Sequence, residues 1–152
     1  MFHIVLVEPE IPPNTGNIAR LCAATGSKLH LIEPLGFSLD EKQLKRAGMD
    51  YWQLVDWQTW RDWPTFTASV TVSGARMFLL TTKTARPYTA VRFHDGDYLV
   101  FGRETKGLSA SLLAADADRC LTIPMANPAA RSLNLATSVG IVLYEAIRQI
   151  NS

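Results

Sequence analysis

The 152-residue sequence is poor in cysteine and histidine and carries almost no net charge. Its two cysteines, Cys22 and Cys120, lie far apart without a second ligand at zinc spacing, so we expect no metal site. The three single histidines are typical of strand edges and loops rather than of a catalytic cluster. Fifteen lysines and arginines against fourteen acidic residues give a net charge of +1, which excludes the basic field of a non-specific nucleic-acid binder. Any nucleic-acid partner must therefore be bound by a local basic patch.

Long hydrophobic runs and targeting signals are also missing. No stretch of about 18 apolar residues occurs, which excludes a transmembrane helix. The N-terminal segment has no basic leader and no small-residue cleavage site, and its short apolar run ends at Glu8. We therefore expect a cytoplasmic protein with no membrane partner. The sequence has no internal repeat or linker, and its length suits one domain over residues 1–152.

Strand-like and helix-like segments alternate along the chain. The expected strands are 3–8, 29–32, 77–82, 98–101 and 120–123, and the expected helices are 17–25, 40–47, 57–66, 109–115 and 132–150. This alternation favours an α/β fold, with a mostly parallel sheet covered by helices. Ligands of such folds bind at the loops that leave the carboxyl ends of the strands.

The last expected helix has apolar residues around much of its circumference. One stripe contains Leu133, Ala136, Val139, Gly140, Leu143, Ile147 and Ile150, and a second contains Leu135, Val139, Val142 and Ala146 beside Ile141. The charged fraction of 19% is also below the usual share of about 25%. The helix is either enclosed within its own domain or part of a homodimer interface. We favour the interface, because Ala136 and Gly140 would permit close approach.

The first of three candidate loops precedes the expected helix 17–25. Its prolines and Gly16 fix a turn, and Asn14 or Asn17 can cap the helix. Arg20 shares a helical face with Asn17, opposite the apolar face. A solvated arginine is the plain explanation, whereas its position beside a strand end favours a functional one.

The second loop, residues 101–108, has two glycines five positions apart and so resembles a phosphate-binding loop only superficially. A Walker motif needs lysine and then serine or threonine after the second glycine, where this chain has Leu108. No G-x-G-x-x-G dinucleotide motif occurs. What remains is a strand end where Gly102 and Gly107 let a ligand approach the backbone.

The third loop follows Pro124, which ends the last expected strand. We expect Ser132 to cap the final helix and Asn134 to lie in its first turn. A plain cap and loop would account for both residues. An asparagine among apolar residues nevertheless requires a hydrogen-bonding partner, and a ligand is one candidate.

Together, the three loops resemble a known family. The matching motifs are Asn14-x-Gly16-Asn17-x-x-Arg20, Phe101-Gly102-x-Glu104-x-x-Gly107-Leu108, and Ile123-Pro124-Met125 followed by Ser132-Leu133-Asn134-Leu135. In this order, across nearly the whole chain, they resemble the SPOUT superfamily of AdoMet-dependent RNA methyltransferases. Segments 8–17 and 46–51 are similar to the minimal enzymes that methylate the ribose 2'-hydroxyl of the wobble nucleotide, position 34, of tRNA.

The resemblance implies a C-terminal deep trefoil knot and S-adenosyl-L-methionine (AdoMet) as the methyl donor, with no metal. It implies that AdoMet is surrounded by Leu80, Gly102, Ile123 and Ser132. It also implies that Arg20 and Asn134 lie at the catalytic centre and that Glu104 orders its own loop. The chain departs from the family in a roomier 126–130 loop, in Arg103, and in Ala136 where a hydroxyl residue is common. An arginine is a costly general base, because a guanidinium gives up its proton only at very high pH. We therefore assign Arg20 to clamp a phosphate and stabilise the developing alkoxide.

The function implied is AdoMet-dependent 2'-O-methylation of nucleotide 34 in the tRNA anticodon loop. Two alternatives stay open: methylation of another RNA ribose, and a non-catalytic RNA-binding or AdoMet-sensing module. Intact Arg20, Ser132 and Asn134 argue against the module.

Two groups of residues could contact RNA. Local basic patches lie at Lys42, Lys45 and Arg46 and within 76–106, which holds six basic residues against three acidic ones. Four tryptophans, Trp52, Trp57, Trp60 and Trp63, fall within twelve residues and could stack on bases or pack a helix onto the sheet. We favour packing, because Trp57 and Trp60 would share a helical face.

Overall fold

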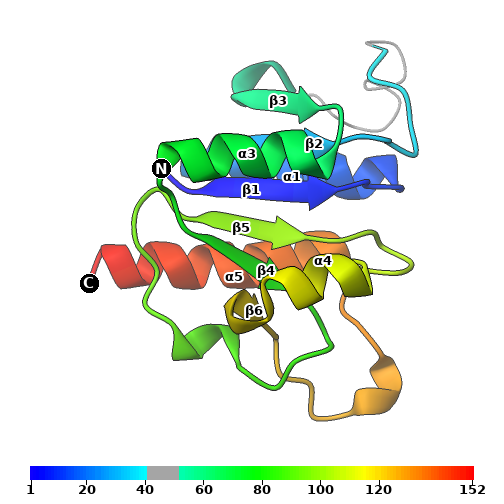
Figure 1. Ribbon diagram of the computed structural model, residues 1–152. Coiled ribbons are helices and arrows are strands. Elements are labelled where there is room, and N and C mark those ends of the chain that lie inside the picture. Colours follow the sequence, from blue (N-terminus) through cyan, green and yellow to red (C-terminus); the bar gives the residue numbers. More distant parts are fainter. Residues whose placement is uncertain (41–51) are drawn as a thin grey trace.

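The computed structural model describes residues 1–40 and 52–152 (Figure 1). Its strands are β1 (His3–Val7), β2 (Lys28–Ile32), β3 (Trp57–Trp60), β4 (Met77–Leu80), β5 (Tyr98–Phe101) and β6 (Cys120–Leu121). Its helices are α1 (Pro12–Thr25), α3 (Trp63–Ser73), α4 (Ala110–Ala115) and α5 (Leu135–Ile150), with 3-10 turns at Trp52–Leu54, Tyr88–Ala90, Ala117–Arg119 and Pro128–Ala130. The expected helix 40–47, the 46–51 motif and the Lys42 to Arg46 patch lie, apart from residue 40, outside the described residues.

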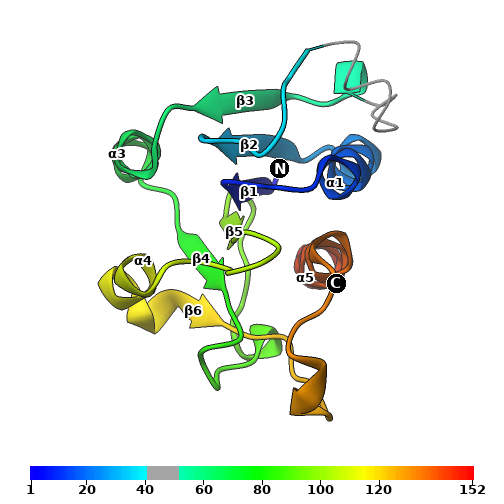
Figure 2. The same ribbon diagram turned by 90° about the vertical axis from the view of Figure 1, so that its right-hand side faces the viewer.

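The strands form one parallel sheet in the order β3-β2-β1-β5-β4-β6. Helices α1 and α5 cover one face of the sheet, and α3 and α4 cover the other (Figure 2). Each face buries its own apolar cluster: Ile18, Leu99 and Val142 belong to the first, and Phe66 and Val100 to the second. The expected α/β fold with a parallel sheet between helices is therefore confirmed. Because all strands run the same way, the loops after β1, β4, β5 and β6 emerge at one edge.

The expected helix 57–66 is wrong, because its first residues form the edge strand β3 and the helix begins only at Trp63. Asp62 caps that helix by accepting a hydrogen bond from the Thr65 backbone nitrogen at 2.8 Å. Trp57 and Trp60 do not share a face, because residues three apart in a strand point to opposite sides of the sheet. Trp57 packs against the α1 and α5 cluster, and Trp60 against the α3 and α4 cluster. The tryptophans thus pack onto the sheet as expected, but from both of its faces.

The first helix begins earlier than expected, at Pro12, and neither asparagine caps it. Prolines at the first two positions suit a helix start, because the nitrogens there need no intrahelical partner. Asn14 and Asn17 consequently lie inside the helix, where their side chains are available for other contacts. The helix ends as expected at Gly26, whose φ of +66° is the left-handed conformation that glycine adopts at helix ends.

A chain of three rings crosses β1, β2 and β3 on the α3 side of the sheet. The Trp60 indole donates to Nδ1 of His30 at 3.0 Å, so the neutral His30 ring carries its hydrogen on Nε2. That nitrogen faces Nδ1 of His3 at 2.9 Å and donates to it. Burial lowers the pKa of His30 to about 3 and also lowers the pKa of His3. Both histidines are therefore neutral in the folded protein near neutral pH.

This burial predicts a loss of stability in mild acid. The unfolded chain binds protons at its histidines below about pH 6.5, whereas folded His30 does not. The free energy of unfolding therefore decreases as the pH is lowered from about 6.5 toward about 3. We expect the free energy of unfolding to drop by about 1–2 kcal/mol between about pH 7 and about pH 5. Urea unfolding across this range measures the slope. A His30→Gln variant should have a shallower slope, and an equal slope in both proteins would contradict the assignment.

Candidate active site

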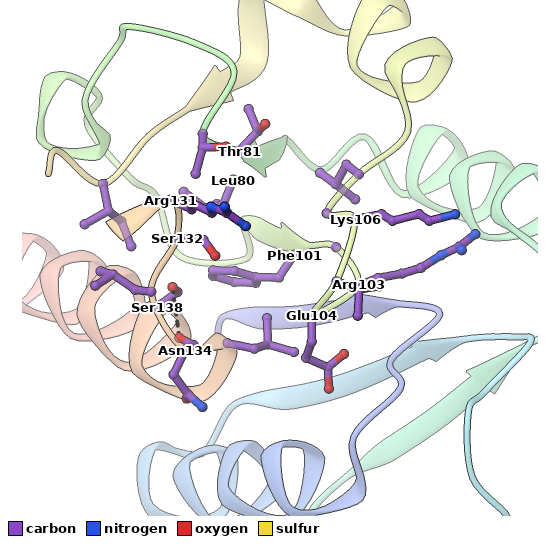
Figure 3. A pocket seen from close by; sticks show the side chains of 18 of the residues that line it. Leu80, Thr81, Phe101, Arg103, Glu104, Lys106, Arg131, Ser132, Asn134 and Ser138 are labelled. Atoms are coloured by element: carbon purple, nitrogen blue, oxygen red, sulfur yellow. Dashed lines mark hydrogen bonds between the residues drawn. The ribbon is translucent and has the colours of Figure 1, made fainter. Parts of the chain in front are cut away.

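A cavity of about 460 Å³ lies at the carboxyl edge of the sheet (Figure 3). Its wall is formed by residues from segments 80–83, 101–108, 122–125 and 131–138, together with Ile11 and Asn14. The first three segments follow β4, β5 and β6, and the fourth leads into α5. All three loops identified in the sequence therefore meet here, joined by the end of β4.

Five of the six candidate site residues line this cavity. They are Leu80, Gly102, Ile123, Ser132 and Asn134. Arg20 is not in the cavity wall: it is an exposed residue of α1, about 9 Å along the helix and about 120° around it from Asn14. The cavity of a single chain thus contains the candidate cofactor residues but not the candidate catalytic arginine.

A hydrogen-bonded network joins the three loops behind the cavity. The Glu104 carboxylate accepts from the backbone nitrogens of Glu10 and Ile11 at 2.9 and 2.7 Å, which holds the loop before α1. It also accepts from Nδ2 of Asn14 at 3.4 Å. Asn14 in turn accepts from Nδ2 of Asn134 at 3.1 Å. Glu104 therefore attaches its own loop to the segment that leads into α1, and Asn14 and Asn134 are partners.

The loop after β5 folds back on itself so tightly that Gly102 admits no side chain. A Cβ on Gly102 would overlap the backbone of Gly107 and Leu108. Gly107 has a φ of +65° and donates its backbone N–H to the Arg103 carbonyl at 2.9 Å. The space that a Gly102 side chain would need is thus filled by the loop itself. Gly102 still lines the cavity through its backbone.

The expected cap at Ser132 is wrong, because Asn134 is the N-cap of α5. Its Oδ1 accepts from the Thr137 backbone nitrogen at 3.1 Å, and the helix begins at Leu135. Ser132 lies too far upstream, just after a turn centred on Arg131. At Arg131, φ is +66° and ψ is −63°, and the Ser132 nitrogen donates to the Ala130 carbonyl at 2.8 Å. This is a γ-turn of the strained hand, which is rare for a residue with a side chain.

The charged side chains around the cavity are mostly cationic. Among the described residues the wall contains Lys83, Arg103, Lys106 and Arg131, against the single carboxylate of Glu104. Arg103 is neutralised by Glu8 at 3.0 Å. Nearby, two hydrogen bonds from Thr105 hold the pKa of Glu10 below its usual value. Arg131 had no predicted role, and its position directly before Ser132 was the available signal.

The interior of the cavity combines apolar and polar groups. Leu80, Phe101 and Leu108 are buried residues of the wall, and Ile123 is partly buried. Backbone groups of the three loops and the Ser132 hydroxyl supply polar contacts at the margin. A nucleoside has flat apolar faces and polar edges, so this wall and volume suit such a ligand. The described residues contain no group of His, Cys, Asp and Glu that could hold a metal, and no described helix is long and apolar enough to cross a membrane.

A parallel sheet between two helical layers, with a cavity closed by three loops at its carboxyl edge, is the architecture of SPOUT methyltransferases. The chain belongs to the SpoU rRNA Methylase family, which matches residues 1–144. It is 51% identical over 151 residues to a tRNA (cytidine(34)-2'-O)-methyltransferase of Escherichia coli K12, covering 99% of this chain and 94% of the relative.

Solved structures agree with the fold. A protein studied for the 2-OH methylation of C/U34 on tRNA is 47% identical and superposes with a TM-score of 0.91, covering 99% of this chain and 97% of the other. The SpoU methyltransferase AviRb of Streptomyces viridochromogenes, solved in complex with AdoMet, is 25% identical with a TM-score of 0.81. That match covers 99% of this chain and 61% of AviRb.

The closed loop after β5 predicts that Gly102→Ala is far more damaging than Gly107→Ala. The first substitution forces the loop backbone apart, whereas the second only places a side chain at positive φ, which costs about 1 kcal/mol. We expect Gly102→Ala to lower the free energy of unfolding by more than about 2 kcal/mol. Chemical denaturation of both variants measures the difference. Equal stability of the two would contradict this account of the loop.

Proposed function

We propose that this protein transfers the methyl group of AdoMet to the ribose 2'-hydroxyl of nucleotide 34 in tRNA. The observation that carries the proposal is the network of Glu104, Asn14 and Asn134, which joins all three motifs at one cavity. Relatives with about half of their residues identical over nearly the whole chain have names that specify this reaction. A tRNA substrate also implies a cytoplasmic location.

The cofactor assignment follows the character of the cavity wall. In the proposal Leu80 and Ile123 contact the adenine through apolar surface, while Gly102 and Ser132 contribute backbone and hydroxyl groups. AdoMet supplies, when bound, an electrophilic methyl on a sulfonium; the ribose oxygen takes the methyl, the C–S electron pair stays on sulfur, and the hydroxyl proton leaves to water.

Arg20 and Asn134 have separate roles in the proposed reaction. Arg20 binds a phosphate next to the reacting ribose and stabilises the negative charge that develops on the 2'-oxygen. The Asn134 amide donates one hydrogen to Asn14 and accepts one hydrogen bond from the Thr137 nitrogen. A side-chain amide has two N–H donors and two oxygen lone pairs, so one donor and one acceptor are left to orient the substrate.

We infer that the working form is a homodimer joined through α1 and α5. One face of α5 contains residues at helical spacing, namely Ala136, Gly140, Tyr144 and Ile147. Tyr144 is 52% exposed. Gly140 lies next to Leu21 of α1. Arg20 belongs to the same helix pair, outside the cavity of its own chain.

We also propose that residues 1–152 are one domain whose C-terminal part forms a deep trefoil knot. Support comes from the segment between β4 and β5, which is bonded on both sides. Its Tyr88 nitrogen donates to the Thr122 carbonyl at 2.9 Å, after β6. Farther along, Gln149 of α5 accepts from the Phe93 nitrogen at 2.7 Å and donates to the Val91 carbonyl at 3.1 Å. In a knot, the chain between β6 and α5 would pass through this segment.

The activity is tested by incubating the protein with labelled AdoMet and bulk tRNA and mapping the methylated nucleoside. We expect a 2'-O-methyl group at position 34. Label at another ribose would keep the reaction and change the substrate. Binding of AdoMet without transfer would instead favour the sensing module.

The same assay separates the roles of charge and shape at Arg20. Arg20→Lys keeps the positive charge but loses the planar pair of donors, so we expect a rate at least about tenfold lower. A nearly full rate would contradict a two-pronged phosphate contact. Circular dichroism of the variant verifies that it is folded.

Tyr144→Asp tests the homodimer, because this exposed side chain can change without disturbing the core. We expect wild-type protein to sediment with the mass of two chains and the variant to dissociate, since a desolvated charge opposes association. Val72→Asp on α3, where the side chain is 89% exposed, is the matched control and should remain associated. A monomeric wild-type protein would refute the interface.

A further inference from the structure

Arg131 is a cation of the cavity wall to which the proposed reaction assigns no task. In Figure 3 its guanidinium lies beside Leu80 and Ser132 at the cavity, whereas the side chains of Arg103 and Lys106 extend away from the cavity. Within residues 1–40 and 52–152, the Arg131 side chain has no hydrogen bond or ion pair. An arginine presents five N–H donors in a fixed plane, so these donors face the cavity without a protein acceptor.

The carboxylates near the cavity have other partners. Glu104 accepts from two backbone nitrogens and Asn14. Glu8 pairs with Arg103, and Glu10 accepts from the nitrogen and hydroxyl of Thr105. No acidic group of the described wall therefore neutralises Arg131. An anion that enters the cavity would meet an unpaired guanidinium.

Hydrogen bonds fix the backbone around Arg131. Asn127 accepts from the Ala129 nitrogen at 3.0 Å, and the Arg131 nitrogen donates to the Pro128 carbonyl at 3.1 Å. The γ-turn at Arg131 follows directly and leads into Ser132. Because this backbone is already ordered, binding of a ligand at Arg131 costs side-chain entropy but little further backbone entropy.

We propose that Arg131 binds an oxyanion that one of the two substrates brings into the cavity. This inference rests on the proposed function and extends it, because that function supplies two sources of such a group. One source is the carboxylate of the amino-acid part of AdoMet, and the other is a phosphate of the RNA. Arginine pairs with either group through two parallel hydrogen bonds.

Calorimetry with S-adenosylhomocysteine and with 5'-methylthioadenosine, which lacks the amino-acid part, tests the first source. If the carboxylate is bound, Arg131→Gln should lower the affinity for S-adenosylhomocysteine about tenfold or more and leave the affinity for methylthioadenosine unchanged. The affinity of Arg131→Lys for S-adenosylhomocysteine should lie between those of wild type and Arg131→Gln, because lysine keeps the charge without the planar fork. The control is Arg92→Gln, an exposed arginine outside the cavity, which should bind both ligands as wild type does.

Titration of tRNA at several salt concentrations tests the second source. If Arg131 binds a phosphate, Arg131→Gln should bind both nucleosides with unchanged affinity and bind tRNA more weakly. It should also reduce the slope of log tRNA affinity against log salt by about one. Thermal unfolding of the ligand-free variant should match wild type, because the side chain has no partner among the described residues.

Unchanged affinity of Arg131→Gln for S-adenosylhomocysteine and for tRNA would overturn the proposal. That result differs from failure of the proposed function, in which the wild-type protein itself would bind no S-adenosylhomocysteine or would methylate no tRNA.

Discussion

The site depends on the carboxylate of Glu104. Its bonds to two backbone nitrogens attach the loop after β5 to the loop before α1, although more than ninety residues separate them. Hydrogen bonds from backbone N–H groups to a carboxylate are stronger than those between neutral groups. The bond from the Glu10 nitrogen is also partly shielded from water. Through Asn14 the same group also fixes Asn134, the first residue of the turn that starts α5. One partly buried carboxylate thus sets the relative positions of three loops.

The two loops that flank the cavity obtain their shapes by opposite means. After β5, glycines remove the side chains that would prevent the backbone from folding onto itself. Before α5, Arg131 adopts a strained turn with its side chain intact. The first loop achieves close packing, and the second keeps a charged group at the cavity at some conformational cost. Residues in sparsely populated conformations cluster at functional sites, which agrees with the place of Arg131.

Much of this organisation was predictable from the sequence. Apolar runs ending in glycine, proline or a charged residue predicted five of the six strands, and the motifs predicted which loops would meet. The helix 57–66 failed because three-residue spacing of tryptophans is compatible with both a helix and the two faces of a strand. Asn134 and Ser132 are both good caps, so the choice between them depended on the turn at Arg131. The position of Arg20 outside the cavity depends on where α1 starts. The prolines at the start of α1 indicate this point better than Asn14 and Asn17 do.

The strand order has a consequence for the chain while it is being synthesised. β1 pairs with β2 on one side and with β5 on the other, and His3 and Tyr98 are neighbours across that second pairing. Until the ribosome has released residue 101, one edge of β1 has no partner strand. An unpaired strand edge is a template for association with another chain. The nascent N-terminal half therefore passes through an interval of aggregation risk that ends only when β5 is inserted between β1 and β4.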